Sequence, residues 1–300
     1  MKRKGFWGGI ASGFFLTALT VFILLDTFVL TSVYSQAESE SPVNAHEPVK
    51  DEPLLTLVKT LDGYDDGQII ISIDAYRGFD SDIYAADIRL SDPAQLKTAF
   101  AQDSYGKNVR EQPSATAERV QAILAINGDY YGAQERGYVL RNGVIYRSSR
   151  AKGREDLVID QDGTFDVIHE QDTQLQALLD AGAVQVLSFG PALVKNREVS
   201  VQAGDLRGKD KTCNPRTAIG RVEGLHYLFV VADGRTEASE GLTIPELAEV
   251  MKALGADTAY NLDGGGSSCM VFGGRVINHP TTSGSRTRER EVSDIVYIGY

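Results

Sequence analysis

Cysteine and histidine, the residues from which most thiol and metal sites are built, are scarce in this sequence. The chain of 300 residues has two cysteines, Cys213 and Cys269, and four histidines. Two cysteines exclude a disulfide framework, and their spacing fits neither a zinc site nor a Cys-x-x-Cys redox motif. One bridge can still form if the domain lies outside the cytoplasm. The histidines show no ligand spacing, and no Gly-x-Ser-x-Gly element is present, which disfavours a Ser-His-Asp hydrolase.

Positive charge is also in short supply. Lys and Arg total 30 against 41 Asp and Glu, and the formal net charge is -11. Phosphate backbones need a basic footprint, so we expect no nucleic acid partner, although a local basic spot can hold one phosphate. The sequence has no Walker loop, no dinucleotide fingerprint and no calcium-loop spacing. We therefore expect no cofactor and no resident metal, while a hard divalent cation such as Ca²⁺ or Mg²⁺ stays open.

The N-terminal region predicts a membrane anchor. Three basic residues at positions 2–4 precede an uncharged stretch over residues 5–25, and about 20 apolar residues in a helix cross a bilayer. The positive flank should stay in the cytoplasm. A cleaved signal peptide is the alternative, with a small-x-small site at residues 35–37, but the apolar region is long for one and ends well before that site. We predict a cytoplasmic stub and transmembrane anchor over residues 1–35, in a single-pass cell-membrane protein whose following domain lies outside.

The remaining chain divides into a linker and one domain. Residues 36–53 are polar and acidic and contain three prolines, which is typical of a solvated linker. Residues 54–300 are enough for one large domain with a sizeable core. Apolar residues make up 42% of the chain and charged residues 24%, as in ordinary globular proteins.

The pattern of this domain is mostly β. Two turn-rich segments, residues 141–143 and 160–164, each join two short β-rich runs and predict hairpins. A helix is expected over residues 173–181, ending at Gly182, and residues 101–119 are expected to form a loop or an irregular helix. The β-rich runs are residues 54–58, 68–73, 83–90, 122–126, 138–140, 144–146, 157–159 and 165–168. We predict a mixed, strand-rich α/β fold, with a mixed β-sheet and flanking helices.

The segment after residue 216 predicts a hairpin with charged ends. Residues 217–222 and 225–232 are strand-like and are separated by Glu223-Gly224. A two-residue turn there pairs Val222 with Leu225 and, further out, Asn214 with Asp233. Arg216 and Asp233 should therefore lie at the same end of the hairpin.

A helix and another strand follow this hairpin. Thr243 and Glu246 form a capping box with a proline in the first turn, and Gly255 ends the helix. Residues 258–262 predict a short strand that ends in Asp263. If the strands on either side of the helix are parallel, Asp233 and Asp263 lie at one edge of the sheet, where open α/β sheets bind ligands. The strand that ends at Asn127-Gly128-Asp129 fits the same edge.

These strand ends offer acid–base chemistry beside anion-binding groups. The run Gly264-Gly265-Gly266-Ser267-Ser268 presents backbone donors and two hydroxyls, which suit phosphate or sugar oxygens. Arg216 and Arg235 add fixed positive charge that can bind phosphate bidentately. A carboxyl group can protonate a leaving group or activate water, as in glycoside hydrolysis. Downstream, arginines at 286, 288 and 290 alternate with glutamates; this is typical of a charged strand face, although Arg290 could reach the site.

Several segments of the chain, which occur in the same order as in the family, resemble the phosphodiester glycosidase family. Together they cover roughly residues 120–300, so the resemblance is specific. The matching segments are residues 125–131 (AINGDYY), 189–193 (FGPAL), 214–220 (NPRTAIG), 231–235 (VADGR), 239–243 (SEGLT), 261–268 (NLDGGGSS), 276–278 (VIN) and 290–292 (REV).

The resemblance implies a hydrolase that removes a sugar from a sugar-1-phosphodiester or a related glycopolymer of the cell envelope. It also implies that the motifs meet in one pocket, in which the catalytic carboxylates are Asp129, Asp233 and Asp263. Which of them is acid and which is base or nucleophile is left open. The expected substrate-binding residues are Asn127, Gly128, Arg216, Arg235, Ser239, Asn261, Gly264, Gly265, Gly266, Ser267 and Ser268.

Two alternative functions are compatible with the same pocket. One is a non-catalytic module that binds envelope glycans, and the other is a phosphodiesterase whose aspartates hold Mg²⁺ or Ca²⁺. Cys213 adjoins the NPRTAIG segment and Cys269 follows the serine pair. If both segments line one pocket, the two sulfur atoms can form a bridge.

Overall fold

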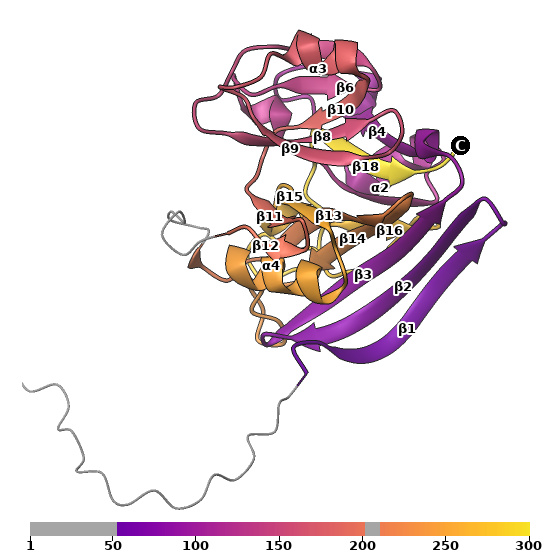
Figure 1. Cartoon of the computed structure of the whole chain (residues 1–300). Coiled ribbons are helices and arrows are strands. Elements are labelled where there is room, and N and C mark those ends of the chain that lie inside the picture. Colours follow the sequence, from indigo (N-terminus) through magenta and orange to yellow (C-terminus); the bar gives the residue numbers. More distant parts are fainter. Residues whose placement is uncertain (1–52, 202–210) are drawn as a thin grey trace, which may run out of the picture. The chain divides into compact units, whose positions relative to one another are not determined.

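The computed structural model of the chain describes residues 53–201 and 211–300 (Figure 1). The predicted anchor and all but the last residue of the predicted linker lie outside this described part. Within it, no helix combines the length and apolar character needed to cross a bilayer. The described residues belong to a structural unit that spans residues 52–300.

Three β-sheets make up most of the described part, so the prediction of a strand-rich, mixed fold is confirmed, but there are three sheets where a single mixed sheet was predicted. The eight-stranded sheet contains, in spatial order, β1 (Thr56–Asp65), β2 (Ile69–Gly78), β3 (Ser81–Leu90), β14 (His226–Ala232), β13 (Arg216–Glu223), β15 (Thr258–Asn261), β11 (Ala192–Lys195) and β12 (Glu198–Val199). The second sheet contains β7 (Val144–Arg147), β6 (Val139–Arg141), β10 (Ala183–Leu187), β8 (Glu155–Asp160) and β9 (Phe165–His169). The third contains β17 (Arg275–Val276), β16 (Met270–Phe272), β5 (Leu124–Asn127), β18 (Asp294–Ile298) and β4 (Leu96–Phe100).

The helices are short and connect these strands. They are α2 (Pro113–Arg119), α3 (Leu175–Ala181) and α4 (Ile244–Ala253), with 3-10 turns at Pro93–Gln95, Ala101–Asp103, Tyr131–Ala133 and Gly265–Ser267. Both predicted hairpins are present, as β6–β7 and β8–β9. The predicted helix also forms, with Gly182 as its left-handed C-cap. The expected irregular region contains α2 and one 3-10 turn.

The hairpin β13–β14 forms, but its predicted register is wrong by one residue. Arg216 pairs with Ala232 and Glu223 with His226, so Val222 does not face Leu225. A bulge between Arg221 and Glu223 shifts the ladder, because a bulge places two residues opposite one. The turn consists of Gly224 and Leu225. Arg216 and Asp233 still lie at the same end of the hairpin.

The strand–helix–strand unit brings two carboxylates to one sheet edge. The capping box of α4 is confirmed, with the Thr243 and Glu246 side chains each bonded to the other's backbone. Strands β14 and β15 both pair antiparallel with β13, which lies between them, so they run parallel to each other. Asp233 and Asp263 therefore follow strand ends at the same edge, two strand spacings or about 10 Å apart.

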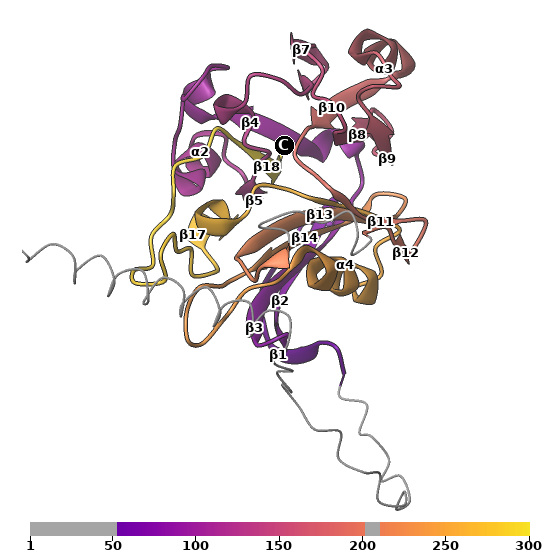
Figure 2. The same ribbon diagram turned by 90° about the vertical axis from the view of Figure 1, so that its left-hand side faces the viewer.

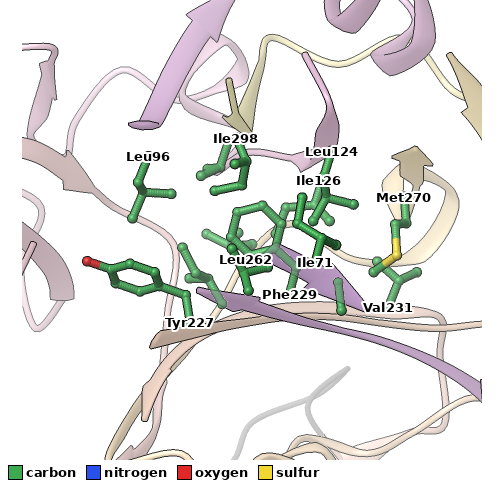
Figure 3. Close-up of a cluster of buried hydrophobic side chains, with 14 of the residues drawn as sticks. Ile71, Leu96, Leu124, Ile126, Tyr227, Phe229, Val231, Leu262, Met270 and Ile298 are labelled. Carbon is green, nitrogen blue, oxygen red and sulfur yellow. The ribbon is translucent and has the colours of Figure 1, made fainter. Parts of the chain in front are cut away.

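Both faces of the eight-stranded sheet are covered around this edge. Along β14, Leu228 and Val230 pack in the cluster that contains α4, whereas Phe229 and Val231 pack against the third sheet. Figure 2 shows α4 on one side of the sheet, and β5 and β18 on the other. In Figure 3, Phe229 and Val231 lie beneath side chains such as Ile126 from β5. This two-sided burial fixes the strand ends that carry the site.

Candidate functional site

Asp263 is held by a hydroxyl and a guanidinium at the start of the glycine-serine turn. One carboxylate oxygen, Oδ2, accepts from Ser267 Oγ at 2.6 Å and from Arg290 Nη2 at 3.1 Å. Arg290 also donates to Ser267 Oγ. The Asp263 side chain is 12% exposed and that of Arg290 39%. Burial raises the pKa of Asp263, while Ser267 and Arg290 oppose that shift. This carboxyl is thus suited to proton transfer.

Asp233 is more fully enclosed than Asp263. Its Oδ1 accepts from Asn278 Nδ2 at 2.9 Å, and both carboxylate oxygens accept from the backbone N–H of His279. The imidazole Nδ1 of His279 lies 3.0 Å from Asp233 Oδ2 and 3.1 Å from the Tyr84 hydroxyl. Burial and the nearby Asp233 raise the pKa of Tyr84. The hydrogen-bond capacity of Asp233 is therefore largely committed to protein partners.

The two predicted arginines lie at the same end of the hairpin, Arg216 at the start of β13 and Arg235 just after β14. Arg216 is buried and donates from Nε to the Leu242 carbonyl at 2.8 Å. Arg235 donates to Asn214 Oδ1 at 3.0 Å and to the Thr282 carbonyl at 2.5 Å. Both arginines are thus anchored close to the edge between the two carboxylates.

Part of the glycine-serine run bonds to the protein itself. Gly265 N donates to the Pro215 carbonyl at 2.7 Å, and Ser268 N donates to the Gly265 carbonyl at 3.2 Å. Gly265 has φ +62°, and a Cβ there would lie 2.9 Å from Arg235 Nη2. A Cβ on Gly266 would lie 2.4 Å from Thr282 Oγ1. The glycines therefore permit close packing of the arginine and the 282 loop.

Four of the predicted binding residues form hydrogen bonds with backbone groups at or near the strand ends that carry the carboxylates. Asn127 Nδ2 donates to the Asp263 carbonyl at 2.6 Å, and the Gly128 carbonyl accepts from Asp263 N at 3.1 Å. Ser239 Oγ donates to the Asp233 carbonyl at 2.9 Å. Asn261 Nδ2 donates to the Gly190 carbonyl at 2.7 Å. These contacts hold the two strand ends in place.

The side chain of Asp129 belongs to a separate buried cluster, although its backbone lies next to that of Asp263 through the hydrogen bond from Asp263 N to the Gly128 carbonyl. Its Oδ2 lies 2.8 Å from Arg141 Nη2 and accepts from Ser188 N at 2.7 Å. Arg141 also contacts Asp294 at 2.9 Å. Burial and the Asp129 charge raise the pKa of Asp294 to about 7. The triple links β6 to β18 and is closed to solvent, since all three side chains are at most 2% exposed.

A cavity of about 410 Å³ has Arg290, the ion-pair partner of Asp263, in its wall. Its lining has four arginines and two glutamates, which is a local positive excess in a chain of net charge -11. The lining residues are Arg110, Thr282, Ser283, Ser285, Arg286, Arg288, Glu289, Arg290 and Glu291. A buried carboxyl with a shifted pKa at the edge of a basic cavity can act on an anionic substrate. Over residues 53–201 and 211–300, no group of three His, Cys, Asp or Glu side chains is arranged to hold a metal ion.

The sequence profile of the family described as phosphodiester glycosidase matches residues 120–299, which is more than half of the chain. The chain belongs to this family. Among curated relatives, the SPbeta prophage-derived uncharacterized protein YomE of Bacillus subtilis is 28% identical over 201 residues. N-acetylglucosamine-1-phosphodiester alpha-N-acetylglucosaminidase of Mus musculus is 24% identical over 211 residues. These alignments cover 65% and 64% of this chain, but 31% and 40% of the two relatives.

Two solved structures share the fold. One is the zebrafish N-acetylglucosamine-1-phosphodiester alpha-N-acetylglucosaminidase catalytic domain, auto-inhibited by its pro-peptide. It has a TM-score of 0.60 and 22% identity, and the match covers 84% of this chain and 85% of that one. The other is a hypothetical protein from Synechocystis, with a TM-score of 0.60, 13% identity and coverage of 83% and 64%. At such identities the likeness concerns the fold alone.

Three residues around Asp233 escaped the sequence-based prediction. Asn278 lies in a matching segment but had no role assigned, His279 has no ligand spacing, and Tyr84 lies on β3, far away in sequence. The signal that joins them to Asp233 is spatial, because β3 pairs with β14 and the chain after β17 returns to this edge. Pairing of distant strands is not visible in local sequence patterns.

The suggested disulfide is wrong. Cys213 and Cys269 are both free, the former exposed and the latter buried. The Cys269 thiol points to Glu289, with Sγ 3.5 Å from Oε1, and burial raises its pKa. The two segments do meet near one edge, but the Cys269 side chain packs in the core of the third sheet instead.

Proposed function

We propose that this protein is a phosphodiester glycosidase, which hydrolyses a sugar-1-phosphodiester or a related envelope glycopolymer into free sugar and a phosphomonoester. The observation that carries the proposal is Asp263, a buried carboxyl that contacts Ser267 and Arg290 at the wall of the basic cavity. The mouse relative is named for its action on an N-acetylglucosamine-1-phosphodiester, which supports this substrate class.

In the proposed reaction, water attacks the anomeric carbon and the bond between that carbon and the phosphate oxygen breaks. The oxygen leaves with the phosphate, where Arg290 stabilises its charge. Asp263 gives its proton to the leaving phosphate oxygen and takes up the proton that the attacking water loses, a role that burial favours because it raises the pKa of this carboxyl. Asp233 positions the segment of Asn278 and His279, which leads into the cavity wall. Asp129 acts indirectly by fixing β18 through Arg141.

The extracytoplasmic location is part of the same proposal and rests on the sequence. The basic residues 2–4 and the apolar residues 5–25 favour a single-pass anchor with the catalytic domain outside. Membrane fractionation and protease treatment of intact cells test it. A domain that resists protease in intact cells but is digested after lysis would contradict the outward orientation.

The activity is tested with full-length protein and a methyl diester of N-acetylglucosamine-1-phosphate, with and without a chelator. Free sugar and methyl phosphate, formed equally in both conditions, support the proposal. Sugar phosphate and methanol, lost with chelator, indicate the metal-dependent phosphodiesterase. Binding without turnover indicates the glycan-binding module.

The Asp263→Asn variant tests the central residue. We expect at least about a hundredfold loss of kcat, because the amide cannot transfer the proton. Its thermal unfolding should stay close to that of the wild type, since Asn can still bond Ser267. Full activity in a folded Asp263→Asn protein would refute the assignment.

A further inference from the structure

We propose that the cavity beside Asp263 binds a second anionic group, so that the natural substrate is a chain carrying several phosphates rather than one isolated phosphodiester. This inference rests on the proposed function, because it places the scissile phosphate next to Arg290. A single phosphodiester carries one negative charge. The cavity wall offers more positive charge than that one group requires.

The four arginines of the cavity wall differ in the hydrogen bonds and ion pairs that they form. Arg290 donates to Asp263 and Ser267 through Nη2, which leaves its other N–H groups for the scissile phosphate. Arg110 donates to Asn108 Oδ1 at 3.1 Å. Arg286 and Arg288 are exposed, and within residues 53–201 and 211–300 neither side chain forms an ion pair. These two guanidinium groups are therefore available to an anion that enters the cavity.

The two glutamates of the wall offset only part of this positive charge. Glu289 accepts from the Ser114 hydroxyl at 2.6 Å and from Ser114 N at 2.9 Å, so its carboxylate is tied to α2. Glu291 is exposed and remains as one negative charge at the rim. Four arginines against two glutamates leave the cavity wall with a formal charge of +2. The lining hydroxyls of Ser283 and Ser285 lie 2.9 Å apart and add donors for phosphate oxygens.

The backbone places this positive group beside the reacting carboxyl. Arg288 N donates to the Pro280 carbonyl at 2.7 Å, which fixes the segment two residues before Arg290. Residues 286 and 288 are at most four residues before Arg290, so even a fully extended backbone places their Cα atoms within about 14 Å of the Arg290 Cα atom. A neighbouring phosphate of the same chain can thus contact Arg286 or Arg288 while the scissile one contacts Arg290. Arginine suits this role because its planar fork binds phosphate oxygens bidentately.

The test compares anion binding by full-length wild type and an Arg286→Gln/Arg288→Gln variant. By calorimetry, we expect the wild type to bind inorganic tripolyphosphate at least about tenfold more tightly than inorganic phosphate. The variant should lose most of that difference. The control is Arg89→Gln/Arg197→Gln, which removes the same charge from exposed positions outside the cavity and should retain the preference.

A kinetic measurement separates this inference from the proposed function. On an oligomeric phosphodiester substrate, the cavity variant should show a KM raised about tenfold, with a smaller change on the methyl diester. Failure of all hydrolysis, with intact tripolyphosphate preference, would refute the proposed function and leave the anion site. Equal tripolyphosphate affinity in the wild type and the cavity variant, or an equal loss in the control, would overturn the anion site.

Discussion

At the residue scale, the environment of Asp263 decides what its carboxyl can do. Burial raises its pKa, and the contacts from Ser267 and Arg290 limit that rise. Asp233, by contrast, accepts hydrogen bonds on both oxygens and holds the chain at residues 278–279. Two carboxylates at the ends of parallel strands thus have different surroundings, as acid–base sites require.

Replacing Arg290 with Gln should move the pH dependence of catalysis. Arg290 lowers the pKa of Asp263, so its loss raises that pKa further. The limb of the kcat/KM profile that follows Asp263 should shift to higher pH, and the maximal rate should fall about a hundredfold. Rates measured from pH 4 to 9 on the methyl diester check this. A uniform loss without any shift would show that Asp263 is not the titrating group.

At the element scale, the turn after β15 shapes the site because its glycines let neighbouring side chains pack closely against it. The 3-10 turn Gly265–Ser267 has no side chain at its first two positions. Arg235 packs over the first and Thr282 over the second. The turn thereby joins the hairpin β13–β14, the strand β15 and the cavity loop into one site. Glycine here serves contact between elements as well as turn geometry.

The Gly265→Ala substitution should lower activity beyond its effect on stability. The new Cβ would lie 2.9 Å from Arg235 Nη2 and displace the guanidinium from Asn214. We expect about 1 kcal/mol of destabilisation from the left-handed backbone, with at least about a tenfold fall in kcat/KM.

Gly153→Ala is the matched control for that substitution. Gly153 has φ +68° with no neighbouring atom within 4 Å of the added Cβ. It should share the stability loss in urea unfolding and retain activity. Equal activity of the two variants would contradict the role given to Arg235.

At the scale of the whole molecule, buried acids connect the sheets. The triple of Asp129, Arg141 and Asp294 joins the second sheet to the third. Nearby, Asp156 of β8 is buried, and neither of its carboxylate oxygens has a hydrogen-bond partner among the described residues. Burial and the charge of Glu170 raise the pKa of Asp156 to about 9. The folded protein thus keeps a proton that the unfolded chain releases.

Stability should therefore decline as the pH rises. The folded pKa of Asp156, about 9, lies above the ordinary value of 3.8. Between these values the native state binds the extra proton, so its stabilising effect is complete below about pH 4 and is lost as the pH rises through 9.

The Asp156→Asn variant, which mimics the neutral acid, should show a flatter decline of unfolding free energy between pH 5 and 9. Asp103→Asn, at an exposed carboxyl, serves as the control and should follow the wild type. Urea unfolding at several pH values measures all three proteins. Parallel curves for Asp156→Asn and wild type would contradict the buried proton.

The local sequence determined the elements that carry the site. Alternating apolar residues, turn glycines and the capping box of α4 predicted its strands, hairpins and helix, since each depends on neighbours within a few residues. The same patterns placed Asp233 and Asp263 at one sheet edge. They missed the bulge at Arg221, because a bulge is set by pairing and not by composition.

Only the tertiary structure decided which residues meet. It joined Arg290 to Asp263, His279 and Tyr84 to Asp233, and gave Asp129 a buried partner in Arg141. Each of these contacts joins segments that are separated by many residues or lie in different sheets. Local propensity carries no information on such pairings, because they arise when whole faces pack and desolvate together.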